Sequence, residues 1–179
     1  MIAYHVVTDR PMVLGQQIVF DENHHSGVYQ RVMERKELVK DVYAHPEKYP
    51  LPLEHHLDVA IRELAMEQVR KEKFPEYPSR MACLYVSQTL EESVRWGEFF
   101  SRIGRPTYCI VKLNIEGRCF VGNACNCFDG TPELADNLAK AEHYWRNLPN
   151  EDGESITEML VDGVITVAEI VQEINANIP

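Results

Sequence analysis

Residues 81–96 read Met-Ala-Cys-Leu-Tyr-Val-Ser-Gln-Thr-Leu-Glu-Glu-Ser-Val-Arg-Trp. The first seven residues form a short apolar run that is typical of a β-strand. Thr89 is followed three positions later by Glu92, which is the spacing of a capping box at the start of a helix. This stretch therefore predicts a strand that leads directly into a helix, with Tyr85 and Ser87 at the end of the strand.

The segments on either side of this unit carry further strand and helix patterns. Short apolar runs and alternation predict the other strands, which are residues 1–7, 17–20, 107–115, 118–121, 158–164 and 165–171, the last two being either two strands or one strand bent at Gly163. Apolar residues at helical spacing predict helices over residues 29–43, 53–73 and 132–148. Helices fall mainly in the first half and strands mainly later, so we expect an α+β fold rather than a doubly wound parallel sheet. No linker divides the chain, which predicts one domain over residues 1–179 with a helical insertion at about residues 28–75.

The helix predicted over residues 53–73 has the clearest amphipathic pattern. Leu57, Ile61 and Leu64 recur at intervals of three and four, and we expect them to be buried. The side chains expected on its exposed face are Glu54, Asp58, Glu67 and Arg70. If the apolar stripe faced solvent instead, it would form the surface of a homodimer.

Composition limits the classes of function. Lysine and arginine number 18 against 28 acidic residues, and the net charge is -10. A surface that binds nucleic acid or an anionic membrane needs clustered basic residues, so neither partner is expected. No signal peptide is visible, and no apolar run approaches the roughly 20 residues that span a bilayer. The five cysteines are an odd number, which favours reduced thiols and a cytoplasmic location.

Familiar cofactor and catalytic motifs are missing from the sequence. There is no Gly-x-Gly-x-x-Gly, no Walker loop and no Gly-x-Ser-x-Gly elbow. The neighbouring His55 and His56 would point about 100° apart on a helix, which is not the arrangement of a shared metal site. Cys119, Cys125 and Cys127 contain no Cys-x-x-Cys pair. We therefore expect no metal ion in the site.

Three side chains capable of chemistry lie at the ends of apolar strands. His5 lies within Ile-Ala-Tyr-His-Val-Val, Tyr85 lies near the end of its strand, and Glu158 opens Glu-Met-Leu-Val. Taken singly, each has a structural interpretation: a hydrogen-bonded core histidine, a packed tyrosine and a solvated glutamate. Taken together, their positions allow all three to meet at one edge of a sheet, and we expect them to converge on one cleft.

In this order the three segments resemble the motifs of the ADP-ribosyltransferase superfamily. Residues 4–8 (Tyr-His-Val-Val-Thr) are similar to its first motif, residues 84–96 to its second and residues 158–165 to its third. More narrowly, the chain resembles the bacterial DUF2441 family. The resemblance implies a split β-sandwich with flanking helices. The chain departs from the arginine-modifying members, which carry Glu or Gln two residues before the catalytic glutamate, because Ile156 stands there.

The resemblance also implies that NAD is the substrate, and it gives each site residue a role. Glu158 would stabilise the positive charge that develops on the ribose as nicotinamide leaves. Tyr85 would stack on the pyridinium ring, and His5 would hold ribose hydroxyls. The catalytic residues implied are Glu158, His5 and Tyr85, and the NAD-binding residues implied are His5, Thr8, Tyr85 and Ser87. The sequence does not identify the acceptor of the ADP-ribose, because acceptor recognition lies in variable loops.

Two other interpretations stay open. A non-enzymatic member of the same fold would keep the scaffold and act as a binding or regulatory protein. An unrelated α+β interaction protein would carry the three motifs by coincidence. The placement of His5 and Glu158 in one cleft separates the last interpretation from the others, and turnover of NAD separates an enzyme from a binding protein.

Overall fold

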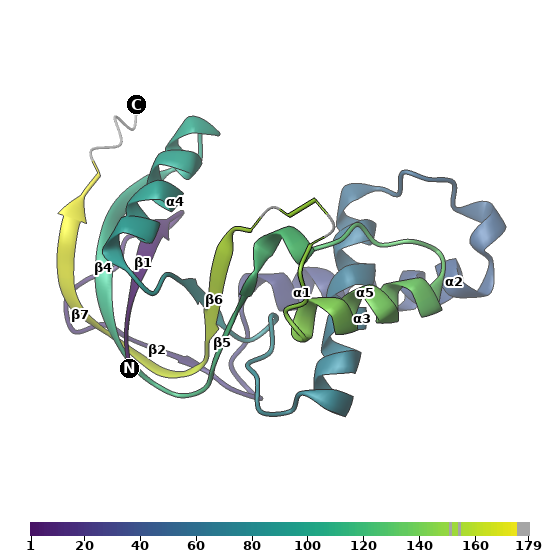
Figure 1. Cartoon of the computed structure of the whole chain (residues 1–179), viewed down its shortest axis with the longest axis horizontal. Helices are drawn as coiled ribbons and strands as arrows, with labels where there is room; N and C mark the ends of the chain where they lie inside the picture. Colours follow the sequence, from purple (N-terminus) through teal and green to yellow (C-terminus); the bar gives the residue numbers. More distant parts are fainter. Residues whose placement is uncertain (151, 154, 175–179) are drawn as a thin grey trace.

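The computed structural model describes residues 1–150, 152–153 and 155–174 (Figure 1). Within these residues the chain forms two antiparallel sheets and five α-helices. The strands are β1 (Ile2–Thr8), β2 (Gln17–Phe20), β3 (Leu84–Val86), β4 (Thr107–Glu116), β5 (Cys119–Asn123), β6 (Thr157–Val161) and β7 (Gly163–Glu173). The helices are α1 (Gly27–Met33), α2 (Lys36–Ala44), α3 (His55–Lys73), α4 (Leu90–Arg102) and α5 (Leu134–Trp145), with short 3-10 turns at Pro46–Lys48 and Ala124–Asn126. The protein is therefore of the mixed α+β class that the sequence predicts.

The two sheets pack face to face around an apolar core. The strand order is β1-β4-β7-β2 in the four-stranded sheet and β3-β6-β5 in the three-stranded sheet, and neighbouring strands are antiparallel. The four-stranded sheet contributes buried residues such as Ala3, Val111 and Leu113, and the three-stranded sheet contributes Val86 and Met159. Because burial of apolar surface is the dominant favourable term in folding, this shared core holds the two sheets together.

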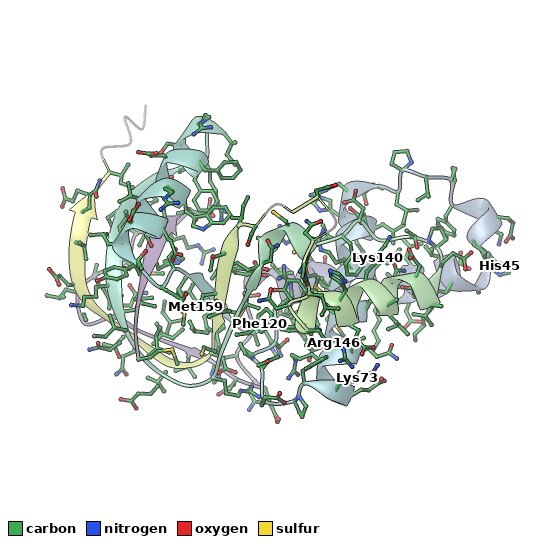
Figure 2. All side chains as sticks on the ribbon, in the orientation of Figure 1. His45, Lys73, Phe120, Lys140, Arg146 and Met159 are labelled. Atoms are coloured by element: carbon green, nitrogen blue, oxygen red, sulfur yellow. The ribbon has the colours of Figure 1, made fainter. Side chains whose placement is uncertain are left out.

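Helices cover the outer faces of the two sheets. In the three-stranded sheet, Met159 faces the core between the sheets, whereas Phe120 faces the helices and packs with Met66 of α3 and Trp145 of α5 (Figure 2). The indole Nε1 of Trp145 donates a hydrogen bond to the carbonyl of Met66 at 2.8 Å, which ties α5 to α3. Helices α1 and α2 contact α3, and α4 lies along β1 and β4 (Figure 1). The helix α4 and the α3–α5 pair are thus attached to different sheets.

The predicted strand–helix unit forms, but its strand is shorter than predicted. The Glu92 amide donates to Oγ1 of Thr89 at 3.2 Å, and the Glu92 carboxylate accepts from the Thr89 amide at 3.3 Å, which confirms the capping box. Strand pairing covers only Leu84–Val86. The carbonyl of Met81 accepts from both the amide and the hydroxyl of Ser26, so this end of the predicted strand is held by a loop instead.

One other element differs from the pattern-based expectation, and one open alternative is decided. The helix predicted over residues 29–43 is two helices, because the backbone at Arg35 leaves the helical region with φ -102° and ψ 0°. This break lets Val32 of α1 and Val42 of α2 join the same buried cluster. Near the C-terminus the chain forms two strands rather than one bent strand, because Gly163 has φ +80°, where an L side chain is strained.

The charged face predicted for α3 is partly buried. Of the predicted apolar stripe, Leu57 and Ile61 are buried and Leu64 is half-buried. Arg70, predicted to be exposed, is buried and donates to Glu67 through Nη2 at 2.8 Å and through Nε at 3.0 Å. The loop that follows the helix folds back over this face and supplies a carbonyl to the same guanidinium. A helical pattern cannot show this burial, because it arises from the next segment of the chain.

Candidate functional site

Among the described residues, an isolated β-bridge joins the edge strands β1 and β3 of the two sheets. The Tyr4 amide donates to the Ser87 carbonyl at 2.9 Å, and the Ser87 amide donates to the Tyr4 carbonyl at 2.7 Å. In a continuous antiparallel sheet the next hydrogen-bonded pair would be Val6 and Tyr85. Instead, the Tyr85 carbonyl is bound by Nδ1 of His5 at 2.8 Å. We refer to this place, where β1 and β3 separate between Val6 and Tyr85, as the split.

The bridge also determines which side chains share a face. Residues paired across strands point to the same face, and so do alternate residues along a strand, which puts Val6 and Tyr85 on one face. Tyr85 pairs with Leu160, so Glu158, two residues before Leu160, lies on that face too. The helix α4 packs against Val6 on this face, and α3 and α5 pack against Leu160. The split therefore opens onto the face that lies between α4 and the α3–α5 pair (Figure 1).

The main-chain groups of Val6 point into the split. The N–H and the C=O of Tyr4 both point towards β3, where they bond to Ser87. In an antiparallel strand every second residue points its main-chain groups to the same side, so the N–H and the C=O of Val6 also point towards β3 and away from β4. Outside the strand ladders, no hydrogen bond in the described part of the chain involves either group. A donor and an acceptor side by side on one residue suit a planar amide, which carries the complementary acceptor and donor.

Ser93 of α4 is a buried polar side chain for which the described residues provide no hydrogen-bond partner. Its relative exposure is 0%, and its Oγ is unbonded. It lies one turn before Gly97, where a Cβ would sit 3.1 Å from Cδ1 of Ile174 and 3.8 Å from Cγ1 of Val6, so this face of α4 packs on the four-stranded sheet over β1. Leaving a buried hydroxyl unpaired costs about 1–3 kcal/mol. Sequence reasoning missed Ser93, because its burial depends on how α4 packs.

His5 is neutral at physiological pH. Its pKa is lowered from 6.5 to about 4, chiefly because burial disfavours the charged ring; the bond to the Tyr85 carbonyl opposes this shift and the positive charge of Arg105 adds to it. A carbonyl can only accept, so in the neutral ring Nδ1 carries the hydrogen. Nε2 is consequently the unprotonated nitrogen and can accept a hydrogen bond from a ligand hydroxyl.

The lowered pKa of His5 predicts a specific loss of stability in acid. The unfolded chain takes up a proton near pH 6.5, whereas the folded chain does so only near pH 4. Stability is therefore lost as the pH falls through this window, by on the order of 2 kcal/mol at pH 4.5. His5→Asn keeps a donor at the position of Nδ1 and cannot titrate, so its free energy of unfolding should fall less between pH 7 and pH 4.5 than that of the wild type.

Urea unfolding at the two pH values measures this difference. The control is His55→Asn, because His55 is exposed on α3. If wild type and His5→Asn lose the same stability, His5 is not a neutral group in the folded protein.

Glu158 is held in a buried ion network. Its Oε1 accepts from Nη1 of Arg80 at 3.0 Å and from the hydroxyl of Tyr144 at 2.6 Å. Nε of Arg80 donates to Oε2 of Glu63 at 3.0 Å. The guanidinium carbon of Arg80 lies 5.4 Å from the ring centroid of Tyr85 and 4.9 Å from that of Tyr144. Arg80 therefore connects the ring at the split to the carboxylate of Glu158.

The charges of this network balance locally, because Nε of Arg62 also lies 3.2 Å from Oε1 of Glu63. Burial alone would lower the pKa of Arg80, but the carboxylate of Glu63, the two tyrosines and Glu158 outweigh it and raise that pKa well above its usual value. Burial and the neighbouring Glu158 raise the pKa of Tyr144, so this phenol keeps its proton and donates it to the carboxylate. Oε2 of Glu158 accepts no hydrogen bond from the described residues. One carboxylate oxygen is thus committed to the network, and the other is available.

The structure connects the predicted site residues but does not place them all on one face, because by the same alternation His5 leaves β1 on the face opposite to Val6, Tyr85 and Glu158. His5 binds the main chain of Tyr85, and the ring of Tyr85, 38% exposed, reaches Glu158 through Arg80. Ser87 contributes its main chain to the bridge, and its hydroxyl makes no hydrogen bond within the described ranges. Thr8 lies further along β1 and donates to Asp9 at 3.3 Å. The pairing of Glu158 with Arg80 spans 78 residues, so no local motif could have indicated it.

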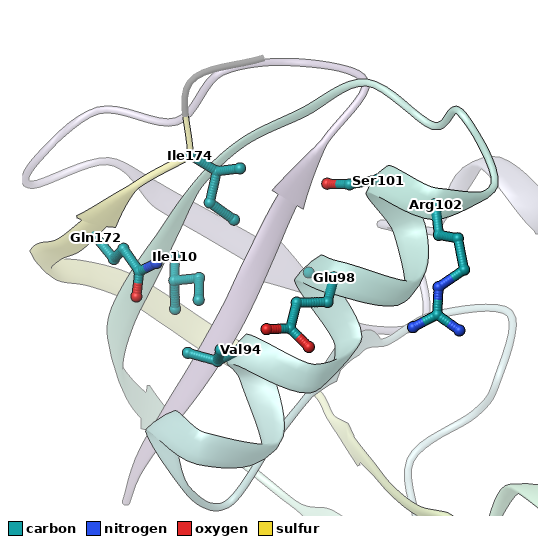
Figure 3. A pocket seen from close by; sticks show the side chains of 8 residues that line it. Val94, Glu98, Ser101, Arg102, Ile110, Gln172 and Ile174 are labelled. Atoms are coloured by element: carbon teal, nitrogen blue, oxygen red, sulfur yellow. The ribbon is translucent and has the colours of Figure 1, made fainter.

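Two cavities lie away from these residues. One, of about 590 Å³, lies between α4 and the end of β7 and is lined by residues that include Val94, Glu98 and Ile174 (Figure 3). The other, of about 700 Å³, lies between helices α1 and α3 and the loops around Ser79 and Arg118. Neither is lined by the predicted catalytic residues.

Over the residues that the structure covers, no three His, Cys, Asp or Glu side chains gather as a set of metal ligands would. Likewise, none of the helices described is both long enough and apolar enough to cross a membrane.

The sheets, the bridge and the split together define a class: an α+β protein whose two antiparallel sheets share a core and separate at one edge. The family model described as "Protein of unknown function (DUF2441)" matches residues 3–173. The chain belongs to this family, which confirms the narrower of the two resemblances seen in the sequence. A search of curated proteins finds no match.

Proposed function

We propose that this protein has an ADP-ribosyltransferase-like split β-sandwich and binds NAD as a substrate at the split. It would cleave the bond between nicotinamide and ribose and transfer ADP-ribose to an acceptor. The observation that carries the proposal is the open main chain of Val6 at the split, together with the buried, unbonded hydroxyl of Ser93 on the helix that packs on the same strand. These groups form a donor–acceptor set for which the described protein has no other use.

The carboxamide of nicotinamide fits this set. Its carbonyl can accept from the Ser93 hydroxyl and the Val6 amide, and its NH₂ group can donate to the Val6 carbonyl. The flat, cationic ring can stack on Tyr85, whose face attracts positive charge. Nε2 of His5 can accept from a ribose hydroxyl, and the hydroxyl of Ser87 or Thr8 can add a further hydrogen bond.

The chemistry requires a group that stabilises positive charge on the sugar. When the bond from C1′ to the ring nitrogen breaks, its electron pair leaves with nicotinamide and the ribose becomes oxocarbenium-like. Oε2 of Glu158, which the network leaves unbonded, is suited to a ribose hydroxyl and to this developing charge. The nucleophilic atom of the acceptor then forms its bond to C1′ and releases its proton to solvent.

A binding protein without turnover is the second candidate, and a specific observation favours it. Nη1 of Arg80 lies 3.0 Å from Oε1 of Glu158. Its positive charge offsets much of the negative potential of the carboxylate, which would otherwise stabilise an oxocarbenium-like state. Such a protein would hold NAD through the same groups and act as a regulatory or binding protein.

Ser93→Ala tests the proposal by separating binding from stability. We expect NAD to bind about 10-fold more weakly, because one hydrogen bond to the carboxamide is lost. The thermal stability should stay equal or rise, because the substitution removes an unpaired buried hydroxyl and introduces a better helix former. Calorimetric titration with NAD and thermal unfolding measure the two quantities.

Ser101→Ala is the control, since Ser101 is an exposed serine of the same helix. If wild type and Ser93→Ala bind NAD equally well, the Ser93 hydroxyl does not contact the ligand, and the proposal loses that support.

A further inference from the structure

One flank of α4 carries an aromatic stripe, which consists of Trp96, Phe99, Phe100 and Ile103. The spacing of three, four and seven residues puts these side chains on one side of the helix. The ring centroid of Trp96 lies 5.8 Å from that of Phe99 and 5.7 Å from that of Phe100. Phe99 is 43% exposed and Ile103 is 60% exposed, so the stripe offers apolar surface to solvent.

The aromatic stripe is on the side of α4 that faces the split. The opposite flank, with Val94 and Glu98, lines the cavity against Ile174 at the end of β7 (Figure 3). Since the sheet order is β1-β4-β7-β2, the flank away from β7 lies towards the edge strand β1. A contact supports this placement: Phe100 packs under the guanidinium of Arg105, which binds Asp9, the residue after β1.

Asp9 and Phe100 hold the guanidinium of Arg105 in place, and its Nη1 can still donate a hydrogen bond. Its Nη2 and Nε donate to Oδ2 of Asp9 at 2.6 and 3.2 Å, and its guanidinium carbon lies 5.1 Å from the ring centroid of Phe100. Nη1 makes no hydrogen bond to the residues described. Its positive charge acts on His5 in the split, lowering the pKa of that ring, so the two groups are electrostatic neighbours.

We propose that the aromatic stripe and Arg105 bind the adenosine diphosphate half of NAD, an inference that rests on the proposed function. Nη1 of Arg105 would bind a phosphate oxygen, and the adenine would stack on Phe99. A flat base stacks on an aromatic ring whatever its sequence context, and a diphosphate needs a local cation on a chain whose net charge is -10. Phe99 lies six residues beyond Ser93, about 9 Å along the helix, so the ligand would run from Ser93 towards the end of α4.

Titration with ADP-ribose and with AMP isolates this half of the ligand. We expect Phe99→Ala to weaken binding of NAD, ADP-ribose and AMP by about 5- to 100-fold, which is the range for loss of one stacked base. Arg105→Gln should weaken the same ligands. Asp9→Asn, which leaves Arg105 in place without its carboxylate partner, should bind them at least as tightly as the wild type. Ser93→Ala should leave the affinity for AMP unchanged.

The controls match the substitutions in exposure. Ile170→Ala removes an apolar side chain that is 42% exposed on β7, and Arg95→Gln removes an exposed arginine of α4 that is paired with Glu91. If NAD binds but Phe99→Ala and Arg105→Gln behave like these controls, the inference is wrong and the proposed function stands. If AMP and ADP-ribose bind in a Phe99-dependent way while Ser93→Ala does not affect NAD, the inference stands and the nicotinamide half of the proposal fails.

Discussion

Arg80→Met is expected to lower the free energy of unfolding by about 3–5 kcal/mol. Arg80 is 6% exposed and is the cation between Glu63 and Glu158, which are 3% and 9% exposed. Without it, Glu158 remains buried with no counter-charge and Glu63 keeps only Arg62, whose Nε lies 3.2 Å from its Oε1, and that costs more than the ion pairs themselves contribute. Urea unfolding followed by tryptophan fluorescence measures the change, because Trp145 is buried.

Two further variants separate the loss of charge balance from the loss of packing. Arg95→Met removes an exposed ion pair and should cost less than about 1 kcal/mol. Adding Glu63→Gln and Glu158→Gln to Arg80→Met removes both carboxylates that pair with Arg80, so stability should partly return. A triple variant no more stable than Arg80→Met would mean that packing, and not charge, explains the loss.

Glu158→Gln is expected to slow nicotinamide release by about 10²–10³-fold while the affinity for NAD changes little. The amide keeps the shape and the hydrogen bonds of the carboxylate but lacks the charge that stabilises the oxocarbenium-like state. Nicotinamide release, followed by chromatography, gives the rate, and calorimetry gives the affinity.

Glu63→Gln is the matched control for this substitution. Glu63 is also buried and also binds Arg80, so each variant removes one carboxylate partner of Arg80. Only Glu158 is proposed to reach the ribose, so Glu63→Gln should change the rate no more than a few-fold. Equal rates in the two variants would give Glu158 a structural role alone. A wild type that binds NAD without releasing nicotinamide would favour the binding-protein interpretation.

The features that the sequence predicts correctly are local ones. The capping box of Thr89 and Glu92 involves residues three positions apart, and strand β2 ends where its apolar run ends. The break at Arg35 was missed because both halves of that segment carry a helical pattern, and only packing on α3 separates them. Local hydrogen bonds and periodicity thus predict an element, whereas its boundaries also depend on tertiary contacts.

The candidate site was predictable only in part. The position of His5 on the first strand and of Tyr85 before the capped helix indicated that they could meet, and the hydrogen bond at 2.8 Å joins the His5 ring to the main chain of Tyr85, not to its side chain. Arg80 and Ser93 were missed for different reasons. Arg80 reaches a carboxylate 78 residues away, and Ser93 differs from an ordinary helix serine only in its complete burial without a partner.

Calorimetric titration of wild-type protein with NAD tests the central claim most directly. We predict saturable binding of one NAD per chain, and we predict that AMP and nicotinamide each reduce it by competing for one half of the site. An absence of saturable heat at millimolar NAD would contradict the claim that the split is an NAD site.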